Sequence, residues 1–339
     1  MGYDELKSLI DQVSAAPRER VTKIAEPRSL VECFVKGYDP GIKENDWRMS
    51  WQHPSLEKMV RPIVGPTEIG SVKGGSGNGK SSSLRAMFAA VYEEEIRKRG
   101  LDPTDLTLGF KFKPPEGEYS VAWIDTEQSQ SLFYKRMRQM YGDVLGDKSR
   151  RPANFWPFFL KGIPMKWKIK YIEDFCEAMI KQGTPLTLIF LDHIGDFVDN
   201  YNDERQAIDL FAELDELATK YDFSIIYVIH TNSTSSKQNG HVGSQGNRKN
   251  VSELYICPDE NDGRITWIIP EKLRDGPKDF KVSFRRNSKG GYKRDNIEII
   301  NYEKDNDDAL QIVPLPPIDA ATFRERVVDM STMNDYPFS

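Results

Sequence analysis

The stretch that most constrains this chain is GGSGNGKS at residues 74–81, which matches the phosphate-binding pattern G-x-x-x-x-G-K-[ST] at every fixed position. Its glycines allow successive backbone N–H groups to point inward at bound phosphates, in conformations that most L-residues resist. Lys80 supplies a positive charge for the β- and γ-phosphates, and Ser81 supplies a hydroxyl for Mg²⁺. The residues predicted to contact the nucleotide are Gly74, Gly75, Ser76, Gly77, Asn78, Gly79, Lys80, Ser81 and Ser82.

The segments on either side of this loop have the form that a phosphate loop requires. Residues 68–73 are predicted to form a short buried strand, and residues 82–99 a helix with apolar residues along one side. A strand, a glycine-rich loop and a helix in this order are the context that separates a true phosphate loop from a chance match. The sequence therefore predicts a nucleoside triphosphate, ATP, bound together with Mg²⁺.

The composition is that of a soluble globular chain. Its 339 residues are 38% hydrophobic and 29% charged, and the formal net charge is −5. This balance does not suggest wholesale coating of nucleic acid, so any such contact has to come from local basic patches. The chain has no run of 18 apolar residues and no signal peptide, and Cys33, Cys176 and Cys257 favour buried thiols in a reducing compartment. We therefore expect a cytoplasmic protein with no membrane partner.

Apolar runs alternate with helical patterns through the middle of the chain, as in α/β proteins with a mainly parallel sheet flanked by helices. The predicted strands cover residues 119–125, 187–192, 224–230, 253–257 and 264–270, and the predicted helices between them cover residues 169–182 and 203–221. The fold class predicted from these patterns and the phosphate loop is an α/β P-loop NTPase domain.

The composition also divides the chain into three regions. Residues 1–58 are richer in charge and proline, contain a short amphipathic helix at residues 5–13, and form a predicted N-terminal extension that is partly helical. Residues 59–302 hold the predicted ATPase domain. Residues 303–339 begin with an acidic stretch, continue with prolines, and form a predicted C-terminal tail.

Glu127 is a candidate catalytic residue. It follows the apolar strand that comes after the phosphate loop, in VAWIDTEQS. A carboxylate at the carboxyl end of such a strand can polarise the water that attacks the γ-phosphate. The alternative interpretation is that Glu127 caps a helix that starts near Gln128.

Asp192 is a candidate for the magnesium site. It ends the apolar run LTLIFLD, and a carboxylate in this position can hold the hydration shell of Mg²⁺ beside Ser81. By itself the pattern is weak, because an Asp at the end of a buried strand is often only a turn residue. Next to the phosphate loop it becomes the predicted second ligand.

His230 ends a third apolar strand, SIIYVIH, and is a candidate sensor of the γ-phosphate. The alternative is a hydrogen-bonded core histidine, which is also the interpretation given to His53, His193 and His241. Residues 231–250 then form a predicted irregular segment that is polar, contains glycine and carries no acidic residue. Lys237, Arg248 and Lys249 in this segment could follow a nucleic-acid backbone, and the alternative is a solvated surface loop.

In this order, the segments GGSGNGKS, WIDTEQS, LIFLD, YVIHTN, HVGSQGNRKNVSELYIC and EKLRDGP resemble the RecA-like ATPase core of hexameric replicative helicases. The similarity covers roughly residues 60–290 and is nearest to the DnaB family and the compact plasmid RepA helicases. In that family a K-x-R-x-G-P segment reaches the ATP of the neighbouring subunit, with the arginine as a finger. Lys272, Arg274, Gly276 and Pro277 match this segment position by position. The DnaB proteins commonly have Gln at the sensor position, where this chain has His230.

The resemblance implies a RecA-like fold and an ATP- and Mg²⁺-dependent nucleic-acid motor. The simplest version is a ring-forming DNA helicase of a mobile element, with single-stranded DNA as its partner and a hexamer as its assembly. The catalytic residues implied are Lys80, Glu127, His230, Lys272 and Arg274. Two alternatives stay open: a RecA- or Sak-type recombination or annealing ATPase, which forms filaments or rings and pairs strands without unwinding, and a KaiC-like regulatory ATPase with a protein partner.

Overall fold

The computed structural model describes residues 7–8, 47–52, 61–231, 240–273, 278, 280–286 and 292–299, all within the unit Met1–Asn301. Lys7 and Ser8 are helical and lie within residues 5–13, where a helix is predicted; the other residues of that segment lie outside the described residues. The predicted tail at residues 303–339 and most of the predicted N-terminal extension lie outside the described residues. Both domain boundaries therefore stay predictions.

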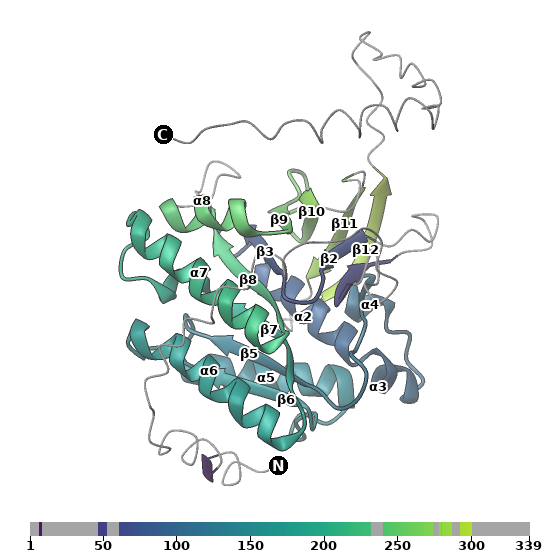
Figure 1. Cartoon of the computed structure of the whole chain (residues 1–339). Helices are drawn as coiled ribbons and strands as arrows, with labels where there is room; N and C mark the ends of the chain where they lie inside the picture. Colours follow the sequence, from purple (N-terminus) through teal and green to yellow (C-terminus); the bar gives the residue numbers. More distant parts are fainter. Residues whose placement is uncertain are drawn as a thin grey trace, which may run out of the picture. The chain divides into compact units, whose positions relative to one another are not determined.

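Among the described residues, nine strands form one sheet in the centre of the fold (Figure 1). The strand order is β12-β11-β10-β9-β3-β8-β7-β5-β6; the strands from β9 to β6 are parallel, and β10, β11 and β12 continue the sheet as antiparallel strands. The strands are β3 (Ile69–Gly74), β5 (Ser120–Asp125), β6 (Phe155–Phe159), β7 (Leu186–Asp192), β8 (Ser224–His230), β9 (Ser252–Pro258), β10 (Ile265–Leu273), β11 (Phe280–Arg286) and β12 (Tyr292–Ile299). The predicted α/β class with a mainly parallel sheet is confirmed.

Helices cover both faces of this sheet, because successive side chains of a central strand point to opposite faces. In β7, Leu188 and Phe190 pack in one hydrophobic core, and Ile189 and Leu191 pack in the other. The first core is covered by α2, α3 and α5, and the second by α6, α7 and α8. The helices are α2 (Lys80–Val91), α3 (Glu93–Lys98), α4 (Thr104–Thr107), α5 (Gln130–Leu145), α6 (Met165–Gln182), the 3₁₀ helix η2 (Ile194–Phe197), α7 (Glu204–Tyr221) and α8 (Gly240–Lys249).

A small antiparallel sheet of β2 (Arg61–Val64), β1 (Met49–Trp51) and β4 (Phe110–Phe112) contributes to the first core. The fully buried ring of Trp51 stacks on Phe110 with centroids 4.6 Å apart and meets the edge of Phe280 at 4.8 Å. Its indole N–H donates to the carbonyl oxygen of Leu108 at 2.8 Å. Trp51 precedes the predicted start of the ATPase domain at residue 59, yet it packs against strands β4 and β11 of that domain.

Two predicted segments differ from the structure in more than their end residues. The helix predicted at residues 82–99 is divided into α2 and α3 at Tyr92, whose backbone leaves the helical conformation. The prediction of an irregular segment is wrong for residues 240–249, which form α8. A side chain at Gly246 would place its Cβ 2.2 Å from the Tyr227 hydroxyl, so this glycine lets α8 pack closely on β8. That packing offsets the low intrinsic helix propensity of glycine.

The described helices include none that is long and apolar enough to cross a membrane. Cys176 is buried, as predicted, whereas Cys257 is only partly buried because it lies near the end of β9. Cys33 lies outside the described residues.

Candidate nucleotide-binding site

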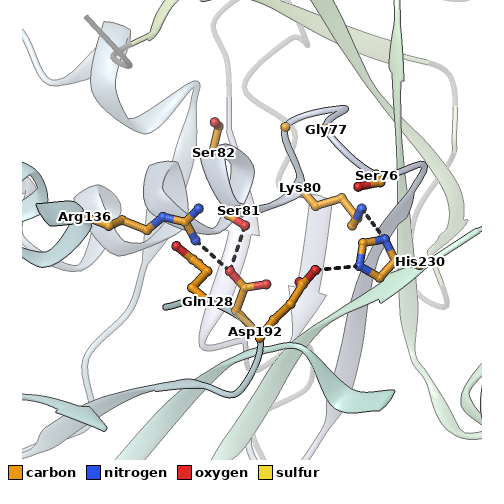
Figure 2. A pocket seen from close by; sticks show the side chains of 11 residues that line it. Ser76, Gly77, Lys80, Ser81, Ser82, Gln128, Arg136, Asp192 and His230 are labelled. Atoms are coloured by element: carbon orange, nitrogen blue, oxygen red, sulfur yellow. Dashed lines mark hydrogen bonds and ion pairs between the residues drawn. The ribbon is translucent and has the colours of Figure 1, made fainter. Parts of the chain in front are cut away.

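The carboxyl ends of β3, β8, β7 and β5 meet at one edge of the sheet, because these strands are parallel. In the strand register, Gly74 lies beside His230, and Asp125 lies beside Asp192. A pocket of about 400 Å³ opens at this edge (Figure 2). Its lining residues are Ser76, Gly77, Gly79, Lys80, Ser81, Ser82, Glu127, Gln128, Arg136, Asp192 and His230. The residues predicted from four separate segments are thus brought together.

The phosphate loop turns through two glycines in left-handed conformations, Gly77 with φ 77° and Gly79 with φ 101°. L side chains rarely adopt these angles. Helix α2 begins directly afterwards, so its N-terminus, a favourable position for anions, lies at the pocket, where Lys80, Ser81 and Ser82 are lining residues. Gly74, Gly75 and Asn78 do not line the pocket. Gly74 is needed for a different reason: a Cβ there would lie 2.4 Å from the carbonyl oxygen of Ile256 in the adjacent strand β9.

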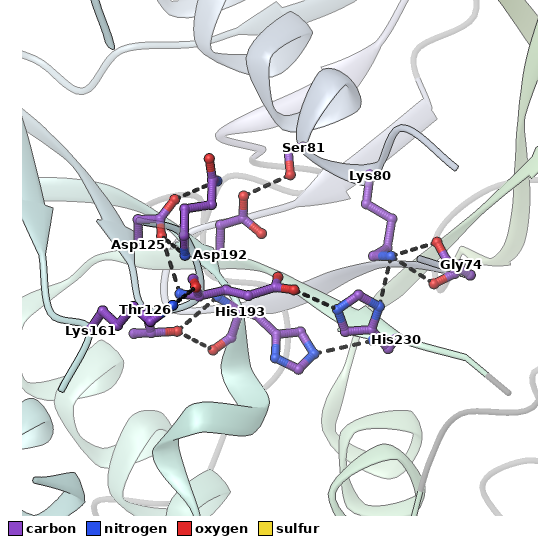
Figure 3. A network of polar contacts seen from close by, with 12 residues as sticks. Gly74, Lys80, Ser81, Asp125, Thr126, Lys161, Asp192, His193 and His230 are labelled. Atoms are coloured by element: carbon purple, nitrogen blue, oxygen red, sulfur yellow. Dashed lines mark hydrogen bonds and ion pairs between the residues drawn. The ribbon is translucent and has the colours of Figure 1, made fainter. Parts of the chain in front are cut away.

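The amine of Lys80 is buried at the base of the loop. It donates to the carbonyl oxygens of Gly74 and Gly75, each at 2.8 Å, and it lies 3.1 Å from Nδ1 of His230 (Figure 3). Burial lowers the pKa of Lys80 to about 8, although the charges of Asp192 and Glu127 oppose this shift. The amine is therefore mostly protonated at neutral pH and positioned to meet phosphate.

Asp192 is buried at the end of β7, and its Oδ2 accepts two hydrogen bonds. The Ser81 hydroxyl donates at 2.7 Å and the Arg136 guanidinium at 3.0 Å (Figure 2). Burial raises the pKa of Asp192, and Arg136 and Ser81 act against that rise. A hydroxyl and a carboxylate side by side are the hard oxygen ligands that Mg²⁺ prefers. Ser81 and Asp192 therefore fit the predicted magnesium site.

Arg136 is a pocket residue that sequence reasoning missed. It lies on α5, whose N-cap is Ser129, with its hydroxyl 3.4 Å from the backbone N–H of Leu132. The helix could have been found from the spacing of Phe133 and Met137, which are buried. The pattern would not have shown that Arg136, alone among the basic residues of α5, lines the pocket.

Glu127 does not cap a helix, because Ser129 is the N-cap of α5. Its carboxylate is about half exposed, with Oε1 3.5 Å from Nε2 of His230. The hydrogen bond from His230 is the main cause that lowers the pKa of Glu127 to about 2, and burial opposes it. Glu127 is thus ionised at neutral pH, as a residue that orients and polarises water must be.

The backbone that carries Glu127 is held from two sides. Asp125 accepts hydrogen bonds from the N–H groups of Glu127 at 3.2 Å and Gln128 at 3.0 Å, and Lys161 donates to the Glu127 carbonyl at 2.7 Å. Burial raises the pKa of Asp125 to about 6, despite the backbone hydrogen bond from Gln128. These contacts fix the strand end from which the Glu127 side chain reaches the pocket.

His193, predicted only to be a hydrogen-bonded core histidine, lies directly behind the pocket and contacts His230. It directly follows Asp192 and is almost fully buried, and its Nε2 lies 3.3 Å from the backbone nitrogen of His230. The two rings are 4.5 Å apart. Burial lowers the pKa of His193 to about 3, so the ring is neutral and can accept the hydrogen bond from His230.

Of the other predicted residues, those that the structure describes do not line this pocket. The Lys272 amine donates to the Asn247 carbonyl of α8 at 2.5 Å. Arg248 and Lys249 are exposed in the last turn of α8, where Lys249 pairs with Asp215 at 3.0 Å. Lys237, Arg274, Gly276 and Pro277 lie outside the described residues.

Arg248 and Lys249 lie towards the opposite edge of the sheet. They come directly before β9, which starts at Ser252 beside Gly70, near the beginning of β3. The phosphate loop follows the other end of β3. The predicted nucleic-acid contacts at Arg248 and Lys249 are therefore separated from the pocket.

The strand β3, the left-handed glycines, helix α2 and the pair Ser81–Asp192 together define a P-loop nucleotide-binding domain. The family model described as AAA domain matches residues 42–236, more than half of the 339 residues. The chain belongs to this AAA-domain family of P-loop ATPases. The comparison with curated proteins gives no match.

Proposed function

We propose that this chain is an ATP- and Mg²⁺-dependent nucleic-acid motor, a ring-forming DNA helicase related to the DnaB and plasmid RepA helicases, which hydrolyses ATP between subunits. The observation that carries the proposal is the position of Leu273, the residue directly before Arg274, relative to Gly74. Leu273 pairs with Ser252 of β9, and Ser252 pairs with Gly70 of β3. Leu273 is therefore level with the beginning of β3.

This position separates Leu273, the last residue of β10, from the phosphate loop of the same subunit. Gly70 lies four residues before Gly74, which corresponds to about 13 Å along the strand, and β9 lies between β10 and β3, which adds about 10 Å across the sheet. Strand β10 runs away from the phosphate loop as it approaches Leu273. The described end of β10 therefore lies far from the phosphate loop of its own subunit, and on this ground we infer that the finger segment that begins at Lys272 acts on the ATP of a neighbouring subunit.

The roles of the pocket residues follow from their positions. Lys80 and the N–H groups of the loop bind the phosphates, and Ser81 with Asp192 holds Mg²⁺, which neutralises charge on the phosphates when it is bound. Glu127 orients and polarises the attacking water. His230, between Lys80 and Glu127, contacts the γ-phosphate and reports its presence to the residues that follow β8. An arginine from the neighbour stabilises charge on the transferred phosphoryl group.

The nucleic-acid part of the proposal is supported by two features. The ordered motifs resemble helicase motifs as far as the segment that contains Lys272 and Arg274. In addition, His230 is followed directly by residues 231–239, which carry Lys237 and no acidic residue, so a phosphate sensor and a cationic segment adjoin. Such a segment suits the backbone of single-stranded DNA.

The test is to measure ATP hydrolysis with and without single-stranded DNA, together with unwinding of a duplex that carries a single-stranded tail. A helicase is stimulated by the DNA and separates the strands. Stimulation with strand pairing but no unwinding would support a recombination or annealing ATPase instead. Hydrolysis that no nucleic acid changes would contradict both and favour a KaiC-like regulatory ATPase. Negative-stain images with ATP and Mg²⁺ distinguish rings from filaments.

A further inference from the structure

The candidate sensor His230 is held by His193 as well as by Lys80 and Glu127. The backbone N–H of His230 donates to Nε2 of His193 at 3.3 Å (Figure 3). The backbone of His193 is fixed in turn by Thr126: the His193 N–H lies 3.1 Å from the Thr126 hydroxyl, and this hydroxyl donates to the His193 carbonyl at 3.0 Å. Thr126 therefore holds the backbone of His193, and the His193 ring holds the backbone N–H of His230.

Tyr201 orients the ring of His193. Its hydroxyl lies 3.1 Å from both ring nitrogens. Because Nε2 accepts from His230, the imidazole proton belongs on Nδ1, where it can donate to the Tyr201 oxygen. The phenol group lies directly on Gly195: a Cβ at Gly195 would be 1.4 Å from the Tyr201 hydroxyl oxygen. Only glycine at position 195 leaves room for the Tyr201 phenol in this place.

The backbone of Tyr201 is bound to the first turn of α8. Its carbonyl accepts from the N–H of His241 at 2.8 Å and approaches the N–H of Val242 at 3.4 Å. Tyr201 thus provides an acceptor for two N–H groups at the start of α8, where a helix needs acceptors from outside. Gly240 makes a close approach possible, since a Cβ there would lie 2.4 Å from the same carbonyl oxygen. Tyr201 therefore contacts His193 with its side chain and α8 with its backbone.

We propose that Tyr201 is a positioning residue for ATP hydrolysis, which acts through His193 to hold His230 between Lys80 and Glu127 and ties that position to the first turn of α8. A movement of this turn moves the Tyr201 carbonyl, and with it the support of the sensor. The kinetic consequence rests on the proposed role of His230. The structural consequence does not, and it can be measured separately.

The kinetic test is the variant Tyr201→Phe, which removes the hydroxyl and keeps the ring and the carbonyl. We expect kcat for ATP to fall about tenfold while KM stays within about twofold, because the phosphate loop that binds ATP is intact and only the sensor is displaced. Tyr171→Phe, at an exposed tyrosine on α6, is the matched control and should leave both constants unchanged.

The structural test follows the imidazole signals of the chain's 4 histidines by NMR in ¹⁵N-histidine-labelled protein. The His230 signal, assigned from its loss in His230→Gln, should move in Tyr201→Phe and not in Tyr171→Phe. Gly195→Ala should move it too, because the added methyl group displaces the phenol. Gly240→Ala should move it from the other side, through the first turn of α8.

The outcomes separate this inference from the proposed function. If the His230 signal has the wild-type position in both Tyr201→Phe and Gly195→Ala, Tyr201 does not position the sensor. A wild-type signal in Gly240→Ala alone would remove the link to α8. If the signal moves and kcat stays at the wild-type value, the contact is structural and the positioning role is refuted. If the wild-type protein hydrolyses no ATP, the proposed function fails, and the signal shifts still decide whether Tyr201 sets the position of His230.

Discussion

Lys80 and His230 are separated by 150 residues in the chain, yet the lysine amine lies 3.1 Å from Nδ1 of the imidazole. Because the amine donates to Nδ1, the ring proton belongs on Nε2, which faces the carboxylate of Glu127 at 3.5 Å. The residue that binds phosphate, the candidate sensor and the candidate catalytic carboxylate therefore form one continuous chain of polar contacts. A ligand that takes the Lys80 amine changes the partners of His230 and, through it, of Glu127.

Replacing the phosphate-loop lysine tests the assignment of the loop. Lys80→Ala should weaken ATP binding strongly and abolish turnover, because Lys80 is the only lysine that lines the described pocket. Binding is measured by calorimetry and turnover by phosphate release. Lys98→Ala, at an exposed lysine paired with Glu95, should behave as the wild type. Normal turnover in Lys80→Ala would refute this loop as the catalytic one.

The lowered pKa of Lys80 makes ATP affinity depend on pH. The pKa is about 8, and bound phosphates favour the charged amine, so above this pH the protein has to take up a proton when it binds ATP. Affinity should be steady at neutral pH and fall by up to about tenfold per pH unit above about pH 8. Titration with a non-hydrolysable ATP analogue between about pH 7 and about pH 9.5 measures this. A constant affinity over that range would contradict the prediction.

Glu127→Gln separates binding from chemistry. The amide keeps the size of the side chain but cannot polarise water as a carboxylate does, so ATP should still bind while hydrolysis falls by about 10²-fold or more. Single-turnover assays and nucleotide-binding assays are compared on the same preparation. Glu118→Gln, at an exposed glutamate, is the control. Loss of ATP binding in Glu127→Gln would show that Glu127 is structural.

Arg136→Ala tests the partner of the buried Asp192. The substitution leaves Oδ2 with the Ser81 hydroxyl, so the free energy of unfolding should fall by about 1–3 kcal/mol. Denaturant titration measures this change. Arg138 is exposed on the same helix, and Arg138→Ala should leave the stability within about 0.5 kcal/mol of the wild type. Equal stability of the two variants would mean that Arg136 contributes nothing to the site.

The site residues that end apolar strands could be predicted from the sequence. The strand at residues 224–230 has the predicted bounds, because its apolar run ends sharply at a polar residue. The strand predicted at residues 187–192 likewise ends at Asp192, although it begins one residue earlier than predicted, at Leu186. Parallel strands bring such ends to one edge, so the meeting of Asp192 and His230 with the phosphate loop followed from the pattern.

The residues that support the site from other elements could not be predicted. Arg136 depends on the direction in which one side chain of α5 points, and the exposed Leu132 and Tyr134 blur the apolar spacing of that helix. Helix α8 was missed because its glycines lower helix propensity, whereas close packing on Tyr227 is what requires one of them. The role of His193 depends on a hydrogen bond to the backbone of another strand, which no pattern of residue types encodes.

The central claim, that each active site is built from two subunits, is tested by mixing two inactive variants. Arg274→Ala should bind ATP and lose about 10³-fold in hydrolysis, and Glu127→Gln should be similarly inactive. In randomly mixed rings, about one quarter of the interfaces pair an intact Glu127 with an intact Arg274 of the neighbour, so the mixture should regain part of the wild-type rate. An active Arg274→Ala, or two inactive variants whose mixture stays inactive, would contradict hydrolysis between subunits.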